Sequence, residues 1–354
     1  MKIVLTCNAG SSNFKLGVFD AATLKRLSRQ QFVDFGAARQ WLRGQPYQIV
    51  AISHRVVHGG REFTGPVKLT PEVIVALKKL IPLAPLHQPQ AIAIIEGLMA
   101  EYADITHIAC FDTAFHHTQD RLERLFALPQ KYAEQGIERY GFHGISYQHI
   151  AEALPDIMGQ KAGGKIVVAH LGGGSSLCAM EGLQSKATTM GFSTLEGLMM
   201  GTRCGSLDAG VPLYLMQQER MTAEAITAML YQNSGLKGVS GISDNMEVLE
   251  KSGAPEAQEA IALYCRMAAR HMGALIAVLG GLDALVFTGG IGEHSAQVRE
   301  RITAYFGWLG FHIDPQKNRQ HASCISGNES RVAAYIIRAD EESVLALAGR
   351  QLTA

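Results

Sequence analysis

Residues 167–180 constrain the fold of this chain more strongly than any other stretch. An apolar run over residues 167–171 enters three consecutive glycines and two serines at 172–176, and a second apolar run leaves them. This pattern predicts a strand, a tight turn and a returning strand. Glycines let a backbone approach a ligand closely, and successive N–H groups in such a turn can bind an anion. The stretch is therefore either an ordinary glycine hairpin or a phosphate-binding loop.

The beginning of the chain repeats this pattern. A short apolar strand over residues 2–7 leads into a small polar turn over residues 8–13, and an alternating strand over residues 14–19 follows. Two strand–turn–strand units, one opening each half, predict a duplicated architecture. Two phosphate loops facing each other across a cleft would be one use of such a duplication.

The rest of the chain alternates between predicted strands and helices, which indicates an α/β fold. Strands are predicted at 49–52, 106–111, 284–288 and 333–337. Helices are predicted at 71–80, 90–102, 145–154, 222–233, 255–279, from about 295, and at 341–352. Residues 21–48 are polar and weakly patterned, residues 83–88 form a loop between prolines, and residues 188–210 are predicted as part helix and part loop.

The composition describes an ordinary globular chain with no charge bias. The 354 residues include 32 basic and 32 acidic side chains, so we expect neither a nucleic-acid partner nor a membrane partner. The six cysteines are scattered without a C-x-x-C pair, which favours buried thiols in a reducing cytosol over disulfides or a zinc site. The apolar start is too short for a signal peptide, and the most apolar run, at 272–282, is too short to cross a bilayer. We therefore expect a cytoplasmic location.

Two stretches follow predicted strands at the edge where α/β proteins bind ligands. Asp112 comes directly after the strand at 106–111, so it is either a site residue or the cap of a following helix. The stretch 289–293 follows the strand at 284–288 with glycines and then a helix, which is the usual geometry for holding a nucleotide. Neither G-x-x-x-x-G-K-[ST] nor G-x-G-x-x-G occurs, so the chain lacks the main sequence signatures of P-loop enzymes and Rossmann dehydrogenases.

A zinc site is the weaker reading of the histidine pair at 54 and 58. The two side chains have i,i+4 spacing, but no carboxylate stands in the H-E-x-x-H register. We therefore expect His54 and His58 to be structural.

Motifs along the whole chain resemble the acetate kinase family, within the actin-like phosphotransferase superfamily. The resemblance rests on NAGSSNFKLGVFD (8–20), HRVVHGG (54–60), PLAPLHQP (82–89), FDTAFH (111–116), RYGFHG (139–144), HLGGGSS (170–176), MGFSTLEGLMMGTRCG (190–205), FTGGIGEH (287–294) and ADEES (339–343). Each motif is weak alone, but their joint order is specific.

The resemblance implies an actin-like, ribonuclease H-like α/β fold with two duplicated lobes. Mixed sheets flanked by helices would form each lobe, with a central nucleotide cleft. We expect an N-terminal lobe over residues 1–148, joined by the C-terminal helix 341–354, and a nucleotide-binding C-terminal lobe over residues 149–340. A cleft between lobes also implies hinge closure during phosphoryl transfer.

The resemblance further implies an enzyme that moves the γ-phosphoryl group of ATP to acetate, giving acetyl phosphate and ADP reversibly. The family uses Mg²⁺ (or Mn²⁺), takes ATP as co-substrate and usually forms homodimers. The alternatives are a kinase of propionate or another short-chain carboxylate, a non-catalytic ATP-binding regulator, and a sugar kinase. A small apolar pocket argues against the sugar kinase, because a polyol needs several hydrogen-bonding side chains.

Four residues would carry the chemistry by this resemblance. Arg55 and Arg203 would bind the acetate carboxylate and the transferring phosphoryl group, as planar guanidinium groups suit spread negative charge. His143 would hydrogen-bond an equatorial phosphoryl oxygen, and Asp112 would orient substrate or metal. Read without the resemblance, either arginine could be an ordinary surface ion-pairing residue, although no acidic partner stands near it in the sequence.

The remaining site residues are also implied by the resemblance. His87 would support a substrate-binding loop, and the acyl methyl group would lie among Val57, Leu86, Phe142 and Thr194. Lys15 would lie near the phosphates. The nucleotide would contact His170, Leu171, Gly172, Gly173, Gly174, Asp244, Asn245, Met246, Gly289, Gly290, Ile291, Gly292 and Glu293. Asn8 and Glu341 match the Mg²⁺ positions, although Glu341 alone could simply stabilise a helix N-terminus.

The chain departs from the family pattern at several positions. Asn13 stands in place of a third serine, Gly173 in place of an asparagine, Ser206 in place of an aspartate and Thr194 in place of a proline. The stretch from residue 20 to residue 49 is also shorter than in typical members. These changes bear on nucleotide affinity and acyl preference, but they remove none of the charges assigned to catalysis.

Overall fold

Strands near the N-terminus form a mixed sheet. The computed structural model describes residues 1–9, 14–85 and 87–353. Within this part, the first sheet contains six strands: β1 (Lys2–Ala9), β2 (Phe14–Asp20), β3 (Arg26–Phe32), β4 (Gln48–Val56), β5 (Val67–Lys68) and β6 (Thr106–Phe111). Their order is β3-β2-β1-β4-β6-β5. The pairs β3–β2, β2–β1 and β6–β5 are antiparallel, whereas β1–β4 and β4–β6 are parallel.

A second sheet repeats this plan later in the chain. Its five strands in the described residues are β7 (Ile166–Leu171), β8 (Ser175–Glu181), β9 (Gln184–Thr188), β10 (Ala284–Thr288) and β11 (Ala333–Ile336). The order β9-β8-β7-β10-β11 matches β3-β2-β1-β4-β6, with the same antiparallel and parallel pairs. The predicted duplicated α/β architecture is therefore confirmed.

Helices of very different lengths flank the two sheets. The α-helices are α1 (Phe35–Arg43), α2 (Pro71–Lys79), α3 (Gln88–Glu101), α4 (Arg121–Arg124), α5 (Gln130–Glu134), α6 (Gly144–Met158), α7 (Gly210–Gln217), α8 (Ala223–Gln232), α9 (Gly235–Ser240), α10 (Met246–Lys251), α11 (Pro255–Leu279), α12 (Gly289–His294), α13 (Ala296–Thr303), α14 (Pro315–Arg319) and α15 (Glu341–Gln351). Short 3₁₀ helices are η1 (Ile81–Leu83), η2 (Ala114–Thr118), η3 (Gly159–Gly163) and η4 (Ala304–Leu309).

Spatial contacts divide the chain into two units. Unit 1 comprises Met1–His117, Phe142–His149 and Asp340–Ala354, and unit 2 comprises Thr118–Gly141 and Ile150–Ala339. The first sheet and α15 belong to unit 1, and the second sheet belongs to unit 2. The grouping places Thr118–Gly141 in unit 2, whereas the division inferred from the sequence placed it in the first lobe. That lobe boundary stays a prediction.

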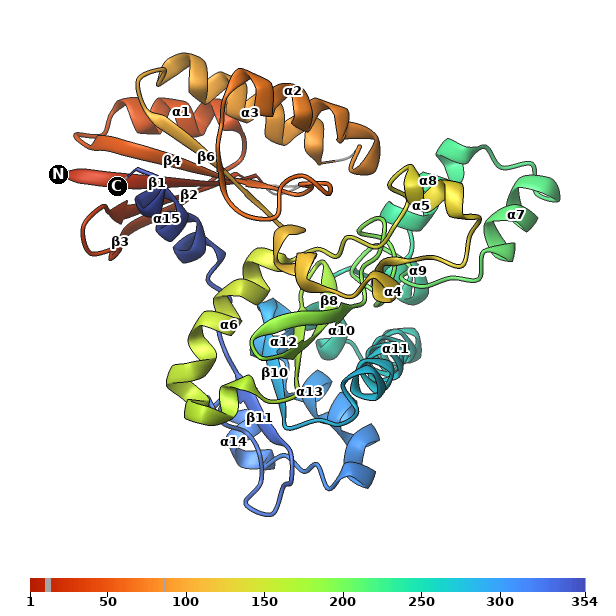
Figure 1. Ribbon diagram of the computed structural model, residues 1–354. Coiled ribbons are helices and arrows are strands. Elements are labelled where there is room, and N and C mark those ends of the chain that lie inside the picture. Colours follow the sequence, from red (N-terminus) through yellow and green to blue (C-terminus); the bar gives the residue numbers. More distant parts are fainter. Residues whose placement is uncertain (10–13, 86, 354) are drawn as a thin grey trace. The chain divides into compact units, whose positions relative to one another are not determined.

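Alternate residues of β1 face different helices of unit 1. Ile3 and Leu5 pack in one apolar cluster with Leu42 of α1, whereas Val4 packs in another with Leu345 of α15. This is the two-residue period of a strand, which points successive side chains to opposite faces. Helices α1 and α3 therefore cover one face of the sheet, and α15 covers the other (Figure 1).

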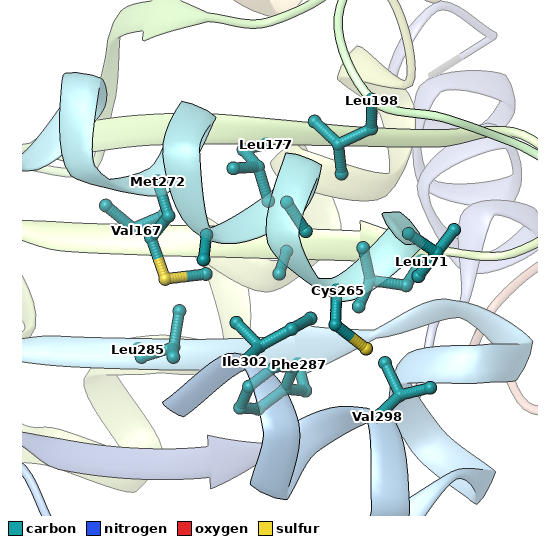
Figure 2. Packing of buried hydrophobic residues seen from close by; sticks show 14 of the residues in the cluster. Val167, Leu171, Leu177, Leu198, Cys265, Met272, Leu285, Phe287, Val298 and Ile302 are labelled. Atoms are coloured by element: carbon teal, nitrogen blue, oxygen red, sulfur yellow. The ribbon is translucent and has the colours of Figure 1, made fainter. Parts of the chain in front are cut away.

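The core of unit 2 forms where α11 and α13 lie on the second sheet. Cys265 and Met272 of α11 and Val298 of α13 pack with strand residues such as Leu177 and Phe287 (Figure 2). All five side chains are buried. Each such side chain contributes roughly 1.5–3 kcal/mol on burial, so this layer stabilises the strand ends that carry the glycine loops.

Helix α11 is the one helix in the described part of the chain that has the length and hydropathy to cross a membrane. The same criteria are met by the core helix of a globular fold. Eleven of its 25 residues are buried, and they belong to the apolar cluster of unit 2. Packing on the sheet therefore explains its apolar composition.

Most elements with a strong local pattern were predicted correctly. The predicted elements at 106–111, 284–288 and 255–279 coincide with β6, β10 and α11. The predicted cap Thr70 accepts a hydrogen bond from the Val73 N–H, and Thr222 accepts one from Ala225. One weakly patterned segment had no element assigned to it, and three expectations were wrong in whole or part. Residues 21–48 contain β3 and α1, Gln88 already begins α3, α12 begins directly at Gly289, and residues 189–209 contain no helix in the described structure.

Candidate active site

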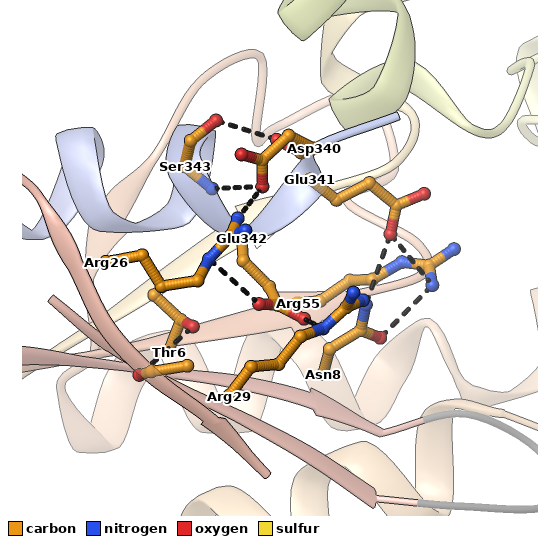
Figure 3. Close-up of polar contacts among 10 residues, drawn as sticks. Thr6, Asn8, Arg26, Arg29, Arg55, Asp340, Glu341, Glu342 and Ser343 are labelled. Atoms are coloured by element: carbon orange, nitrogen blue, oxygen red, sulfur yellow. Dashed lines mark hydrogen bonds and ion pairs between the residues drawn. The ribbon is translucent and has the colours of Figure 1, made fainter. Parts of the chain in front are cut away.

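Arg55 is the centre of a polar cluster at the strand ends of unit 1. Its Nε donates to Asp112 Oδ1 at 2.9 Å and its Nη2 donates to Asp112 Oδ2 at 2.7 Å. Its Nη1 donates to Asn8 Oδ1 at 3.2 Å and lies 3.4 Å from Glu341 Oε2. The Asn8 amide donates to the same Glu341 oxygen at 3.1 Å, so Asn8, Arg55 and Glu341 form a closed set of contacts (Figure 3), and Asp112 joins it through Arg55.

The fold brings these residues together from distant segments. Asn8 lies near the end of β1, Arg55 near the end of β4, and Asp112 directly after β6. Glu341 opens α15, whose cap Asp340 accepts a hydrogen bond from the Ser343 N–H at 3.2 Å. Helix α15 lies close to the sheet because residue 349 is glycine, where an added Cβ would stand 2.6 Å from Val4 Cγ1.

Two arginines of β3 hold the first turn of α15. Arg26 pairs with the Asp340 carboxylate, and Arg29 Nε donates to Glu342 Oε1 at 2.8 Å (Figure 3). The Glu342 side chain is only 4% exposed, which makes its pairing with arginine necessary. The weakly patterned segment after β2 thus contributes to the site by fixing the helix that carries Glu341.

The charged side chains of this cluster shift one another's pKa values. Burial by itself lowers the pKa of Arg55, but the carboxylates of Asp112 and Glu341 raise it overall, so the guanidinium stays charged. Burial raises the pKa of Asp112, and Arg55 opposes that rise. Two carboxylates against one guanidinium leave a formal charge of −1. Arg55 is therefore an ion-pairing residue, and its acidic partners come from β6 and α15.

His143 has the unusual backbone conformation often found at functional sites. Its φ is +59°, in the left-handed region that a residue with a side chain seldom adopts. The next residue must be glycine, because a Cβ at Gly144 would lie 2.2 Å from the Asp112 carbonyl oxygen. The Gly144 N–H donates to that same oxygen at 2.8 Å. The turn therefore ties the backbone of His143 to that of Asp112.

The described residues predicted to line the acyl pocket come from both units. Phe142 is buried, its carbonyl oxygen accepts a hydrogen bond from His116, and its ring meets that of His58 edge-on at 5.6 Å. Val57 and His87 are half-buried. Leu86 lies outside the described residues, as does Asn13 and the rest of the first glycine–serine turn. Thr194 belongs to unit 2.

Unit 2 contains a pocket of about 610 Å³ beyond the ends of β7 and β10. Its lining residues come from three loops and helix starts: Gly172, Gly173, Asp244, Asn245, Met246, Glu247, Glu250, Gly290, Ile291, His294 and Ser295. Pockets of 300–1,000 Å³ are typical of small-molecule and cofactor sites. All three stretches predicted to contact a nucleotide contribute to its wall.

The glycines at the strand ends allow this pocket to form. Gly289 has φ +77°, and a Cβ there would lie 2.7 Å from the Leu171 carbonyl oxygen, so the chain can pass β7 closely only without a side chain. Gly173 differs, because a Cβ there would meet nothing within 4 Å. The missing side chain at Gly173 thus leaves the pocket more open and relieves no clash.

Sequence reasoning both included and missed residues of the pocket. The pocket does not include His170, Leu171, Gly174, Gly289, Gly292 or Glu293 in its wall. It does include Glu247, Glu250, His294 and Ser295, which were not predicted. Helical spacing was the available signal, because Glu250 follows Met246 by four residues on α10 and His294 follows Gly290 by four on α12. Lys15 lies on β2 in unit 1.

Arg203 has a different environment from Arg55. Its Nη1 donates to the Thr194 carbonyl oxygen at 3.0 Å and lies 3.4 Å from Met200 Sδ. Within the described residues its guanidinium contacts no carboxylate, and burial lowers its pKa. A half-buried guanidinium with unused donors is suited to bind an anion. The nearby Ser206 has a structural role, since its hydroxyl accepts a hydrogen bond from the Gly197 N–H at 3.2 Å.

The candidate metal ligands predicted from the sequence are oxygen donors. The described part of the chain has no cluster of three His, Cys, Asp or Glu side chains arranged around a metal. His54 instead hydrogen-bonds His107 at 3.0 Å, and both rings lie in the interior of unit 1, as expected for structural histidines. The carboxylate and amide oxygens of Glu341, Asp112 and Asn8, with their net negative charge, suit a hard divalent cation.

The fold and the pocket define a class before any relative is considered. Two sheets of one topology, each a three-stranded meander extended by parallel strands, with a glycine-lined pocket at the strand ends, describe an actin-like nucleotide-binding protein. Solved structures share this fold. The propionate kinase of Francisella tularensis superposes with a TM-score of 0.93 at 31% identity, over 99% of this chain and 100% of that one. The acetate kinase of Porphyromonas gingivalis gives 0.91 at 30% identity, over 100% of both chains.

Sequence comparison then identifies the family. The acetokinase family model matches residues 37–347. A protein of Rhodopseudomonas palustris (strain TIE-1) named acetate kinase is 53% identical over 303 residues, which are 85% of this chain and 76% of that protein. The chain belongs to the acetokinase family.

Protonation of buried histidines should destabilise the protein in acid. Burial lowers the pKa of His58 and His116 to about 4 and that of His54 to about 3. The unfolded chain, with histidine pKa values of about 6.5, then binds more protons than the folded chain between about pH 6.5 and pH 4. The free energy of unfolding should therefore fall as the pH decreases through this window, by up to about 1.4 kcal/mol per histidine per pH unit.

Denaturant unfolding at about pH 7 and about pH 5 measures this slope. His116→Gln should reduce it, whereas His117→Gln at the exposed neighbouring position should leave it unchanged. An equal slope for wild type and His116→Gln would contradict the assignment of His116 as a neutral buried imidazole.

Proposed function

We propose that this protein is an acetate kinase, which transfers the γ-phosphoryl group of ATP to acetate and forms acetyl phosphate and ADP reversibly. One observation carries the proposal. A chain of the acetokinase family keeps the charged network of Arg55, Asp112, Asn8 and Glu341 at the strand ends of its first sheet. Phosphoryl transfer depends on positioning and charge neutralisation. The network supplies a guanidinium group and oxygen donors that suit these two roles.

The pocket of unit 2 would bind ATP as co-substrate. Its volume of about 610 Å³ accommodates a nucleotide, and its glycine loops expose backbone N–H groups to phosphates. The acidic residues Asp244, Glu247 and Glu250 lie toward the α10 side, where a nucleoside with its hydroxyl and amino donors would be accepted better than a phosphate. Support for this orientation comes from the charges alone.

Magnesium would be held by Asn8 and Glu341, with Asp112 close by. These oxygen donors fit Mg²⁺ or Mn²⁺, and such a cation usually takes its other ligands from water and phosphate. When bound, the cation neutralises charge on the phosphates. The chain's own contribution is to hold Glu341 in place through α15 and to balance the cluster with Arg55.

Propionate is the second candidate acid, because the Francisella structure of the same fold is named a propionate kinase. One methylene group in an apolar pocket changes binding by only about 1–3 kcal/mol, so the two acids are closely matched competitors. Acyl phosphate formed from ATP and trapped with hydroxylamine should be measured with acetate, propionate, butyrate and no acid. Each acid is tested with Mg²⁺, with Mn²⁺ and with a chelator.

The outcomes of this assay are distinct. We expect the highest kcat/KM with acetate and loss of product with the chelator. A higher value for propionate would reassign the substrate. No product with any acid, in a protein that still binds ATP, would instead support a regulatory ATP-binding protein and direct attention to Gly173.

Arg203 should be essential for turnover and not for folding. Its guanidinium has donors left for the transferring phosphoryl group, and loss of one such transition-state guanidinium costs about 10³–10⁵ in rate. We expect Arg203→Ala to lose activity in this range with an unchanged melting temperature. Arg270→Ala, at an exposed site on α11, is the matched control. Near wild-type turnover of Arg203→Ala would rule out the assigned role.

A homodimer is the proposed assembly, as the family resemblance implies. Helix α7 supports it, because none of its residues is buried while Val211, Leu213, Tyr214 and Met216 are exposed. Clustered exposed apolar side chains usually mark an interface. Light scattering should give about twice the mass of one chain, and Leu213→Glu should lower it, whereas Val75→Glu on α2 should not. A wild-type monomer would refute the proposal.

A cytoplasmic location is proposed as well, without a nucleic-acid or membrane partner. The balanced charge and the six unpaired cysteines support it, because exposed and buried thiols persist in a reducing compartment. Recovery of the native protein in a membrane or extracellular fraction of its source cells would contradict this expectation.

A further inference from the structure

Arg299 of α13 is the largest fully buried side chain in the described structure, with 0% exposure. All five of its N–H groups are used. Nε donates to Asn318 Oδ1 at 2.7 Å, and Nη2 donates to Asn318 O at 2.8 Å and contacts His321 Nδ1 at 3.0 Å. Nη1 donates to Gly292 O at 2.8 Å and to Glu293 O at 3.0 Å. Such full use of a guanidinium group requires a specific arrangement of acceptors, because its five N–H bonds point in fixed directions in one plane.

Within the described residues the Arg299 guanidinium contacts no carboxylate, although the charge of Glu250 acts on it from a greater distance. In residues 1–9, 14–85 and 87–353 its guanidinium contacts only carbonyl oxygens, one amide oxygen and one imidazole nitrogen. Burial lowers its pKa to about 10, so the group is still charged at neutral pH. A buried cation that contacts no carboxylate has a large desolvation cost, and the charge of Glu250 offsets this cost only in part. An arginine used only to fill the core could be replaced more cheaply by an apolar side chain.

The contacts of Arg299 converge on the wall of the nucleotide pocket. Gly292 and Glu293 are near the end of α12, and α12 supplies Gly290, Ile291 and His294 to the pocket. A helix of six residues is too short to be stable alone, so its shape depends on outside contacts. The Glu293 carboxylate provides a second set of hydrogen bonds, accepting from the Gly289 N–H at 3.1 Å and the Ala339 N–H at 2.9 Å.

We propose that Arg299 is a positioning residue for nucleotide binding, which holds α12 in the shape of the pocket wall before the nucleotide arrives. It acts through the carbonyl groups of Gly292 and Glu293 and does not line the pocket itself. The inference rests on the proposed function, in which this pocket takes ATP or ADP. Lysine cannot replace the arginine, because one ammonium group cannot span the carbonyls of α12 and the side chain of Asn318 at once.

The experiment compares Arg299→Lys and Arg299→Met with matched changes of Arg301, two residues further along α13. Arg301 donates to Gln258 on α11 at 3.0 Å and has no hydrogen bond or ion pair with α12 in the described structure. For each variant, the Kd of ADP is measured by calorimetry, and kcat, KM for ATP, KM for acetate and the melting temperature are measured beside it. Asn318→Ala, which removes a single acceptor of Arg299 and keeps the charge, is the variant to use if both Arg299 variants fail to fold.

The expected result is a selective loss of nucleotide affinity. Arg299→Lys should raise the Kd of ADP and KM for ATP by about tenfold or more, as expected for lost hydrogen bonds of a charged donor. Its KM for acetate should stay within about twofold of wild type, and Arg301→Lys should change none of these values. Asn318→Ala should show a smaller shift of the same kind.

Two results would overturn the inference. One is wild-type ADP affinity in Arg299→Lys or in Asn318→Ala. The other is an equal weakening of ADP and acetate that follows the melting temperature, which is the signature of general destabilisation. If wild type itself failed to bind ADP, the proposed function would fail instead, so the two failures are distinguishable.

Discussion

Parallel pairing of β1, β4 and β6 is the constraint on which the site of unit 1 depends. The register sets Cys7 beside His54 and Arg55 beside Cys110, so the three strands end at the same edge of the sheet. Asn8, Arg55 and Asp112 must therefore emerge near one another. A shift of one residue in any pair would send Arg55 to the opposite face, since side chains alternate along a strand.

Unit 2 uses the same topology for a different purpose. Its parallel strands β7 and β10 pair with Thr288 beside His170, and a glycine turn follows β7 whereas the glycine-rich helix α12 follows β10 directly. The strand ends of unit 1 thus carry charged side chains, whereas those of unit 2 carry glycines that line a pocket. Duplication of one sheet topology therefore supplies two kinds of site, and the loop residues decide which kind forms.

Three arginines have different charge environments in the two units. Arg55 is surrounded by Asp112 and Glu341, which leaves its cluster net negative and suited to a cation. In the part of unit 2 that the structure describes, Arg203 and Arg299 contact no carboxylate. The positive charge of Arg203 is therefore available to bind an anion, whereas the N–H groups of Arg299 are used to hold α12. A kinase needs both, because metal and phosphoryl oxygens must be stabilised at the same time.

Local sequence patterns were sufficient wherever a few neighbouring residues decide the conformation. Helix α11 was predictable from its long apolar period, β6 and β10 from their apolar runs, and the ends of α2 and α8 from Thr70 and Thr222. The polar segment containing β3 and α1 was not, because β3 is stabilised by pairing with β2 and its own residues show little preference. Family motifs, in turn, pointed to most of the pocket, but no nucleotide contact was predicted for Glu247, Glu250, His294 or Ser295.

The sequence by itself determined the class of fold, the glycine turn between β7 and β8 and the residue types available for phosphoryl transfer. Only the tertiary structure decided which of these residues meet. Arg55 has no acidic neighbour along the chain, yet sheet pairing gives it Asp112, 57 residues away, and α15 brings Glu341 to Asn8 across 333 residues. The local sequence does not distinguish Arg299 from other helix arginines, whereas the tertiary structure gives its guanidinium five contacts. The physical reason is that propensity acts over one turn or one strand, whereas strand register and helix packing join distant segments through long-range contacts.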